Sequence, residues 1–397
     1  MLIALLIGFV LLMAYGKFRR CSWQSLFKMA VSGIPAARNI AIVMLMVGAL
    51  TALWKTCGTV AYIVDLAAGA LTPALYLPSA FLLCAAISVL TGTSIGTAAT
   101  MGVICMSVGT ALGVDSAICG GAILAGSYFG DRCSPVSTSA LLVAEITRTN
   151  LYDNIRAMIR TGWLATVVAL AVYALLGLLA GGNTNAAAAD LGSTVLPFEL
   201  RWFMVLPAIS ILVLALFRVD VKINMLTSIA LSVVVGLFVG LSATEMAMAA
   251  GYGTLSMMKL ILVVVISLTY AGLFKGTGVL DKLHKGITRL SKKVSPFGCV
   301  VLTAIATCAL SCNQTLSIVL TNEICTGVMP NEKRRAIAIE NSSVIIAPLV
   351  PWTVASLVPL GAICAPTTSI LFACFLYLLP LFSILYFRTP KVNQKVS

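Results

Sequence analysis

Apolar segments long enough to cross a membrane alternate along the chain with short polar or charged stretches. Segments such as "ATVVALAVYALLGLLAG" (165–181) and "TSILFACFLYLLPLFSILYF" (368–387) contain no charged residue. A transmembrane helix needs about 20 apolar residues, and the sequence lacks the alternating decamers that form a membrane β-barrel. The pattern therefore predicts an all-α polytopic membrane protein.

Four short polar stretches interrupt the apolar segments. They are "TGTSIGT" (91–97), "GDRCSP" (130–135), "SCNQTLS" (311–317) and "APLVPW" (347–352). Irregular backbone at membrane depth is tolerated only where protein buries it or where it lines a watery cavity. We therefore expect helix breaks or hairpin tips that meet around a polar cavity at mid-depth.

The two halves of the chain resemble each other at a constant offset. Adding 220 to the residue numbers carries "ALWKTCGTV" (52–60) onto "GLFKGTGVL", and "AAISVLTGTSIGT" (85–97) onto "IATCALSCNQTLS". With a shift of four, "SPVSTS" (134–139) stands beside "VPWTVA" (350–355). Each match is weak alone, but a nearly constant offset over some fifty residues predicts an internal repeat.

Composition supports the membrane class and removes one alternative. The chain is 60% hydrophobic and 10% charged, whereas soluble domains carry roughly 25% charged residues. The net charge of +13 could suggest a nucleic-acid partner, but the Lys and Arg residues lie mainly in short loops, as the positive-inside rule expects. We expect a multi-pass protein of the plasma membrane. The first segment, residues 1–17, lacks a basic region and a cleavage site, so we interpret it as a retained span.

The loop charges predict an orientation in which the N-terminus lies outside and the C-terminus lies in the cytoplasm. Loops with Lys and Arg, expected inside, are 16–38, 148–160, 218–222, 276–294 and 388–397. Loops without Lys and Arg, expected outside, are 182–200 and 242–256, flanking spans near 161–181, 201–217, 223–241 and 257–275. Under this orientation the two repeat copies run in opposite directions, which is typical of inverted-repeat secondary transporters.

The same charges predict two re-entrant hairpins and two discontinuous helices. The basic loop "PNEKRR" (330–335) stays inside only if residues 295–327 enter the membrane and return. Symmetry makes 76–111 the opposing hairpin, and 116–147 and 336–362 the discontinuous spans, nine spans in all. The expected organisation is an N-terminal span and interfacial segment (1–35), a first inverted repeat (36–181), connecting spans (182–256), a second inverted repeat (257–387) and a cytoplasmic tail (388–397).

The polar groups at the breaks are the candidate binding residues. Hydroxyl, amide and carboxylate oxygens are hard ligands that suit a small cation. A single Ser or Thr is explained as well by local bonding to its own helix, but the cluster at four corresponding breaks favours a binding site. The candidates are Asp131, Thr93, Ser94, Thr97, Ser134, Ser137, Asn313, Gln314, Thr315, Ser317, Glu340 and Asn341.

Asp131 is the most informative candidate. Because a carboxylate at mid-membrane is costly, such a residue is by default a functional hypothesis. A carboxylate can alternate between a proton and a cation, which is what exchange requires. The alternative is a structural ion pair with Arg132, although adjacent helical residues rarely face each other. Asp131 and Asn313 are the candidate Na+ ligands.

Other chemistries find little support in the sequence. The twelve Cys residues form no CxxC pair, and the single His, His284, lies in a basic linker, so we expect no resident metal or cofactor. "FGD" with Asp153 resembles the paired aspartates of intramembrane proteases, but that class has Gly-x-Gly-Asp and position 128 is Tyr. We therefore expect a transporter and not an enzyme.

At these residues the chain resembles the NhaC family of sodium/proton antiporters within the ion-transporter superfamily. The resemblance covers roughly residues 36–387 and is carried by "GTSIGTAATMGV" (92–103), "AGSYFGDRCSPVS" (125–137), "NQTLSIVL" (313–320) and "IENSSVIIAPLVPW" (339–352). It implies inverted repeats with re-entrant hairpins and cation-coupled exchange. Family members typically have Asp at the position of Thr138, Asn at Leu141 and Asp at Asn341.

The leading hypothesis is an alternating-access cation/H+ antiporter, with Na+ as the cation. The alternative is a Na+- or H+-coupled permease or exchanger for a small organic carboxylate or amino acid, since helix N-termini and amides at hairpin tips also suit a carboxylate. An uncoupled channel is disfavoured because opposing hairpins imply alternating access. The expected partners are a small cation, protons, the lipid bilayer and a second copy of the chain, with no nucleic acid.

Overall fold

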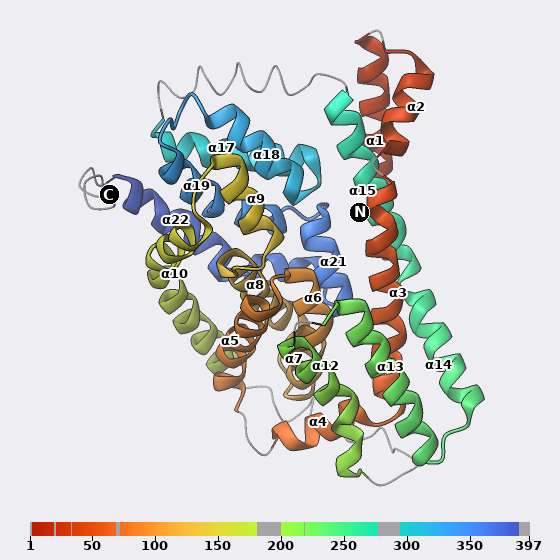
Figure 1. The fold of residues 1–397 in the computed structure, drawn as a ribbon. Helices are drawn as coiled ribbons and strands as arrows, with labels where there is room; N and C mark the ends of the chain where they lie inside the picture. Colours follow the sequence, from red (N-terminus) through yellow and green to blue (C-terminus); the bar gives the residue numbers. More distant parts are fainter. Residues whose placement is uncertain are drawn as a thin grey trace.

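The computed structural model describes residues 2–19, 21–32, 34–68, 72–180, 200–217, 219–276 and 294–388. The regular structure within these residues is helical (Figure 1). Six described helices are long and apolar enough to cross a membrane, or seven if one bent pair counts as a single span, and five shorter apolar helices accompany them. The prediction of an all-α polytopic membrane protein is confirmed. The expected count of nine spans stays a prediction.

One group of helices stands on the right of Figure 1. It comprises α1 (Leu2–Phe18), α2 (Trp23–Ser32), α3 (Pro35–Thr56), α13 (Val221–Phe238), α14 (Ala243–Ser256) and α15 (Met258–Gly276). The backbones of α3 and α14 touch, because a Cβ added to Gly48 would lie 2.3 Å from the carbonyl oxygen of Gly253. Small residues at such contacts let helices approach closely.

Residues 242–256, predicted to be an external loop, are instead mostly helical. They form α14, which packs along α3 and runs on toward α15, so that 243–270 is one apolar helical stretch. The prediction of a loop was wrong because it rested on the absence of Lys and Arg. The segment has Glu245 but no Lys or Arg, and its small residues, such as Gly253, face α3. Most of the other expected external loop (182–200), of the linker 276–294 and of the tail 388–397 lies outside the described residues.

A second group of helices stands on the left of Figure 1 and contains the main hydrophobic core. Its members are α5 (Pro73–Thr91), α8 (Ser116–Cys133), α10 (Leu151–Ala180) and α22 (Cys374–Arg388). Gly126 and Gly130 let α5 lie directly on α8, since an added Cβ would come 2.3 Å from the Phe81 carbonyl oxygen and 2.3 Å from the Ser88 Cβ, respectively. The last turn of α8, which carries Asp131, is thereby held against α5.

The remaining helices connect or cover these two groups. They are α4 (Thr59–Ala68), α6 (Ser94–Thr97), α7 (Val103–Ala111), α9 (Thr138–Thr147), α12 (Leu206–Leu216), α17 (Pro296–Ser311), α18 (Gln314–Cys325), α19 (Glu332–Glu340), α20 (Ser343–Ile346) and α21 (Val354–Ala362). Short 3-10 segments form η3 (Trp202–Val205), η4 (Ala347–Leu349) and η5 (Thr367–Phe372). A π-helical stretch, η1 (Ala98–Gly102), joins α6 to α7. In Figure 1, α4 and the α17–α18 pair lie at opposite ends of the molecule.

The first kind of break has the same backbone geometry in both halves. After α5, Gly92 adopts the left-handed conformation (φ 69°, ψ 24°) and Thr93 is an extended N-cap for α6. After α17, Cys312 is left-handed (φ 53°, ψ 6°) and Asn313 is an extended N-cap for α18. These positions stand 220 residues apart, so the offset found in the sequence pairs residues of equal conformation.

The second kind of break also recurs, 216 residues apart. Between α8 and α9, Ser134 is extended and Ser137 caps the following helix. Between η4 and α21, Val350 is extended and Thr353 caps the following helix. The helices on the two sides of this second break, residues 332–349 and 354–362, meet at 59°. The shift of four inferred from the sequence therefore also aligns equivalent backbone positions.

Candidate functional site

Asp131 lies in the last turn of α8 with only 4% of its surface exposed. Its Oδ1 accepts a hydrogen bond from the Ser137 hydroxyl (2.8 Å), and its Oδ2 accepts one from the Ser139 hydroxyl (3.3 Å). Both serines belong to the first turn of α9, where Ser137 also accepts from the Ser139 backbone N–H (3.2 Å). The positive end of the α9 dipole therefore faces the carboxylate, as is favourable for a negative charge.

The turn between α5 and α6, called the first tip (residues 91–97), supplies a further hydroxyl to this carboxylate. Ser94, the first residue of α6, lies close enough to interact with both Asp131 and Tyr128. The tip is anchored on the break, because the Ser134 hydroxyl donates to the Val89 carbonyl oxygen (2.7 Å). Gly92 completes this contact, since a Cβ there would meet the Val136 backbone at 2.7 Å. The structure thus places Ser94 and Ser137 beside Asp131, whereas Ser134 binds the backbone of α5.

Two other candidates of the first tip serve the backbone of the tip. Thr93 accepts a hydrogen bond from the Gly96 N–H (3.2 Å). Thr97 donates to the Thr93 carbonyl oxygen (2.9 Å) and pairs with the Thr91 hydroxyl (3.2 Å). These threonines fix the shape of the tip, and no hydrogen bond joins either of them to Asp131 within the described chain.

The turn between α17 and α18, called the second tip (residues 311–317), is bonded to α20, which precedes the break at residues 347–352. The Gln314 amide donates to the Val344 carbonyl oxygen (3.1 Å), and the Ser317 hydroxyl pairs with that of Ser343 (2.9 Å). Asn313 accepts from the Thr315 backbone N–H (2.9 Å), so its side chain caps α18. Thr315 itself is exposed. Asn313, Gln314 and Ser317 therefore gather at this tip, whereas the Thr315 side chain faces outward.

A chain of contacts links the second tip to the region of Asp131. The Val354 N–H donates to the Cys312 carbonyl oxygen (3.0 Å) at the second tip. The next residue, Ala355, accepts from the Tyr128 hydroxyl (2.7 Å), and Tyr128 in turn interacts with Ser94. Both tips and both breaks therefore meet in one contiguous region. The two expected Na+ ligands, Asp131 and Asn313, share no hydrogen bond in the described structure.

Glu340 and Asn341 lie beyond Asp131, at the end of α19. Glu340 is fully buried, and neither of its carboxylate oxygens has a hydrogen-bond partner among the described residues. It interacts electrostatically with Arg132 and Asp131. The Asn341 amide donates to the hydroxyls of Thr161 (3.2 Å) and Ser383 (2.9 Å). The structure thus places a second carboxylate within electrostatic reach of the first.

Arg132 is buried but is not the ion-pair partner of Asp131. Its Nη2 donates to the Met158 carbonyl oxygen on α10, and its Nε and Nη1 have no partner in the part of the chain that the structure describes. No hydrogen bond or ion pair joins Asp131 to Arg132 among these residues. The alternative of a structural ion pair, weighed from the sequence, therefore gains no support from the geometry.

Four residues of the region were not among the candidates: Ser139, Tyr128, Arg132 and Ser343. Ser139 follows Ser137 by two positions, and an Asp that accepts from a helix N-cap can also reach the next hydroxyl in that turn. This signal was present in "SPVSTS". Tyr128 and Ser343 act through contacts between segments far apart in sequence, for which no local signal exists.

Two of the three positions at which the chain departs from the family pattern are exposed, whereas the third, Asn341, is buried and follows Glu340 in the sequence. Thr138 and Leu141 are exposed and share one face of α9, at a spacing of three residues. Within the described residues no group of three or more His, Cys, Asp or Glu side chains is placed to hold a metal ion. A small cation at Asp131 would therefore be held by one carboxylate together with hydroxyl and carbonyl oxygens, ligands that suit a hard cation.

Known proteins resemble this chain over most of its length. The profile of the Na+/H+ antiporter family matches residues 1–178 and 126–389. The Na+/H+ antiporter NhaC of Alkalihalophilus pseudofirmus is 27% identical, over 97% of this chain and 89% of the relative, and that of Bacillus subtilis is 27% identical, over 96% and 91%. The malate-2H+/Na+-lactate antiporter of Bacillus subtilis is 25% identical, over 88% and 81%.

Proposed function

The chain belongs to the Na+/H+ antiporter family, and we propose that it is a secondary transporter. It exchanges Na+ for protons across a membrane by alternating access. The observation that carries the proposal is the buried Asp131 carboxylate at a helix break, surrounded by serine hydroxyls. It is the one carboxylate in contact with both a hairpin tip and a break in the described structure.

Exchange at Asp131 follows from the chemistry of its partners. A hydroxyl can donate to a carboxylate through its hydrogen or accept a cation through its lone pairs. When Na+ binds, the hydroxyls of Ser137 and Ser139 rotate so that their oxygens join the carboxylate as ligands. When a proton binds instead, the carboxyl group is neutral and the cation leaves. One site therefore serves both ions in turn.

Glu340 is the second protonatable group of the proposal. Its carboxylate is fully buried, has no hydrogen-bond partner among the described residues and lies within electrostatic reach of Asp131 and Arg132. A negative charge on Asp131 therefore makes the ionised form of Glu340 less favourable. We assign to Glu340 a proton that is released or taken up as Asp131 changes its occupant.

The recurring breaks support an inverted-repeat architecture with two re-entrant hairpins. Positions 220 residues apart share the left-handed and N-cap conformations at the tips. In secondary transporters with inverted repeats, the site lies near the middle of the membrane where discontinuous helices meet. In our proposal, α5–α6–α7 and α17–α18 are the two hairpins, with the N-terminus outside and the C-terminus in the cytoplasm.

A second candidate is exchange coupled to a small organic carboxylate. It is favoured by the malate-2H+/Na+-lactate antiporter among the relatives. The second tip also carries amides, Asn313 and Gln314, at the N-terminus of α18, where a carboxylate would meet backbone N–H groups and the positive end of a helix dipole. In this case Asp131 binds the coupling ion and the second tip binds the organic solute.

Proteoliposomes with an imposed pH gradient test both candidates. In a fluorescence dequenching assay, addition of NaCl alone should collapse the gradient, and KCl should serve as the matched control for ionic strength. A gradient that collapses only when lactate or malate is supplied would favour the second candidate. A gradient that responds to none of these additions would overturn the proposal.

A further inference from the structure

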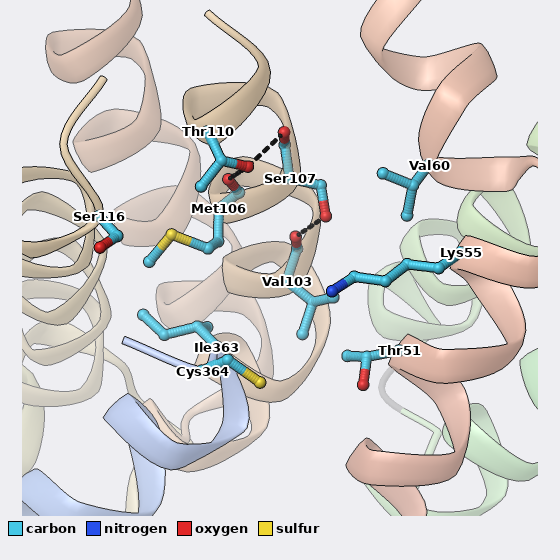
Figure 2. A pocket seen from close by; sticks show the side chains of 10 residues that line it. All are labelled: Thr51, Lys55, Val60, Val103, Met106, Ser107, Thr110, Ser116, Ile363 and Cys364. Carbon is cyan, nitrogen blue, oxygen red and sulfur yellow. Dashed lines mark hydrogen bonds between the residues drawn. The ribbon is translucent and has the colours of Figure 1, made fainter. Parts of the chain in front are cut away.

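A cavity separate from the Asp131 region opens where the two groups of helices meet. Its volume is about 240 Å³, and ten residues line it: Thr51, Lys55, Val60, Val103, Met106, Ser107, Thr110, Ser116, Ile363 and Cys364. They come from α3, α4, α7, the start of α8 and the end of α21 (Figure 2). A molecule bound there would touch helices of both groups.

Lys55 is the one charged side chain among the lining residues. It extends from the end of α3 across the cavity, and its ammonium group lies beside Val103 (Figure 2). It has no hydrogen-bond or ion-pair partner in the described residues. Asp115, next in sequence to the cavity, caps α8 by accepting from the Ala117 N–H (2.7 Å) and does not line the space. The cavity therefore presents an unneutralised positive charge.

The hydroxyl groups of the lining divide into donors and acceptors. Ser107 donates to the Val103 carbonyl oxygen (2.9 Å), and Thr110 donates to that of Met106 (3.0 Å). Since each hydroxyl has one hydrogen, these two offer only acceptor lone pairs to a bound molecule. The Ser116 hydroxyl makes no hydrogen bond within the described chain and is free to donate. A ligand needs both an anionic acceptor group and a hydroxyl donor to use this arrangement.

Apolar side chains complete the wall. Val60, Val103, Met106 and Ile363 would cover a carbon skeleton, whose burial contributes free energy in proportion to its apolar area. An inorganic anion would gain nothing from these side chains. We infer that the cavity binds a small organic hydroxycarboxylate, with its carboxylate at Lys55 and its hydroxyl at Ser107 or Thr110. This inference does not depend on the Na+/H+ exchange at Asp131.

Cys364 provides a direct measurement of occupancy. Its thiol lines the cavity and is exposed. We would measure the rate at which iodoacetamide alkylates Cys364 in the purified full-length protein, by mass spectrometry of its peptide, at a constant Na+ concentration. Sodium lactate should slow alkylation in a saturable way. Sodium propionate, which lacks the hydroxyl, should protect less well, and sodium sulfate should not protect.

Variants assign the protection to the cavity. In Lys55→Met the lactate concentration that gives half-protection should rise roughly tenfold to a hundredfold, the loss expected for one charge-assisted hydrogen bond. Ser107→Ala should raise it severalfold, because it removes an acceptor for the hydroxyl of the ligand. Lys259→Met is the matched control, since Lys259 is also exposed but does not line the cavity. It should leave the protection unchanged.

Several outcomes would overturn the inference. They are equal protection in Lys55→Met, equal protection by sulfate, and stronger protection by glycerol 3-phosphate, which would indicate a phosphate or lipid-headgroup site instead. Na+-driven proton flux, measured on the same preparations, is independent of these results. A protein that exchanges Na+ but shows no lactate protection would refute the cavity assignment alone, and the reverse would refute the proposed function alone.

Discussion

Asp131 and Arg132 are neighbours with opposite charges, yet they contact different parts of the molecule. Asp131 faces the serines of α9, whereas Arg132 reaches the Met158 carbonyl oxygen on α10. The end of α8 therefore separates two charges that a simple reading of the sequence would pair. This separation leaves the Asp131 carboxylate available to an ion.

Replacing Asp131 tests its role directly. Asp131→Asn keeps the volume and the hydrogen-bonding capacity, and it removes a costly mid-membrane carboxylate, so folding should survive. An amide cannot release a proton to make room for a cation, so the exchange should fall to the level of empty vesicles. Asp131→Glu should retain part of the activity. Expression and proton flux, measured on the same vesicles, check both expectations, and near-normal flux in Asp131→Asn would exclude Asp131 from the exchange.

Glu340→Gln separates transport from a structural role. An amide of equal size cannot carry the exchanged proton, so Na+-driven proton flux per folded molecule should be lost while the melting temperature stays close to that of the parent. If Glu340 only balanced the charge of Arg132, the variant would instead lose about 3–5 kcal/mol of stability and its folded fraction would still exchange. A detergent melting curve and a flux assay distinguish these results.

The sequence predicted only some of the residues that lie near the Asp131 carboxylate. Asp131, Ser94 and Ser137 lie together as expected, because each belongs to a polar interruption that a membrane helix cannot otherwise tolerate. Ser139 was missed although it stands in the same motif. Thr315 faces outward because successive residues of a helix point in different directions around its axis, which the motif alone does not reveal.

Among the elements, the contact between α5 and α8 positions the Asp131 turn. Gly130→Ala should destabilise the protein by about 1–3 kcal/mol, the cost typical of overpacking, because the added Cβ would meet Ser88 Cβ at 2.3 Å and the Ala85 carbonyl oxygen at 2.5 Å. Gly251→Ala in α14 is the matched control, since no atom lies within 4 Å of its added Cβ. The control should be neutral or stabilising. Melting temperatures in detergent that fall equally for both variants would contradict this packing.

The positions of the breaks were predictable, whereas the shapes of the intervening segments were not. Glycine and N-cap residues mark Gly92, Thr93 and Ser137 as helix boundaries. Cys312 adopts the same left-handed conformation as Gly92 without being glycine, so only the internal repeat pointed to it. The π-helical turn 98–102 has no local signature, and α14 was missed because a segment without Lys and Arg can be either a loop or a helix.

For the whole molecule, the predicted topology can be tested by labelling. Lys333 is exposed in the first turn of α19, within the basic segment 330–335 that follows the proposed second hairpin. Leu200 is exposed at the end of a loop expected outside. In a background without native Cys, Lys333→Cys should react with impermeant thiol reagents only from the cytoplasmic side. Leu200→Cys should react only from outside. Labelling of Lys333→Cys from outside would require residues 295–327 to cross the membrane and would refute the hairpin.

The adjacency of Asp131 and Arg132 has a thermodynamic consequence for the cycle as a whole. Coupling between two ligands is reciprocal, so if Na+ on Asp131 weakens the hold of Glu340 on its proton by some factor, that proton weakens the binding of Na+ by the same factor. Arg132 follows Asp131 in the same helical turn and interacts electrostatically with Glu340. In our proposal this turn therefore sets the strength of the linkage. A chain with a loosened α8 terminus would still bind both ions, but either ion could then cross the membrane without the other.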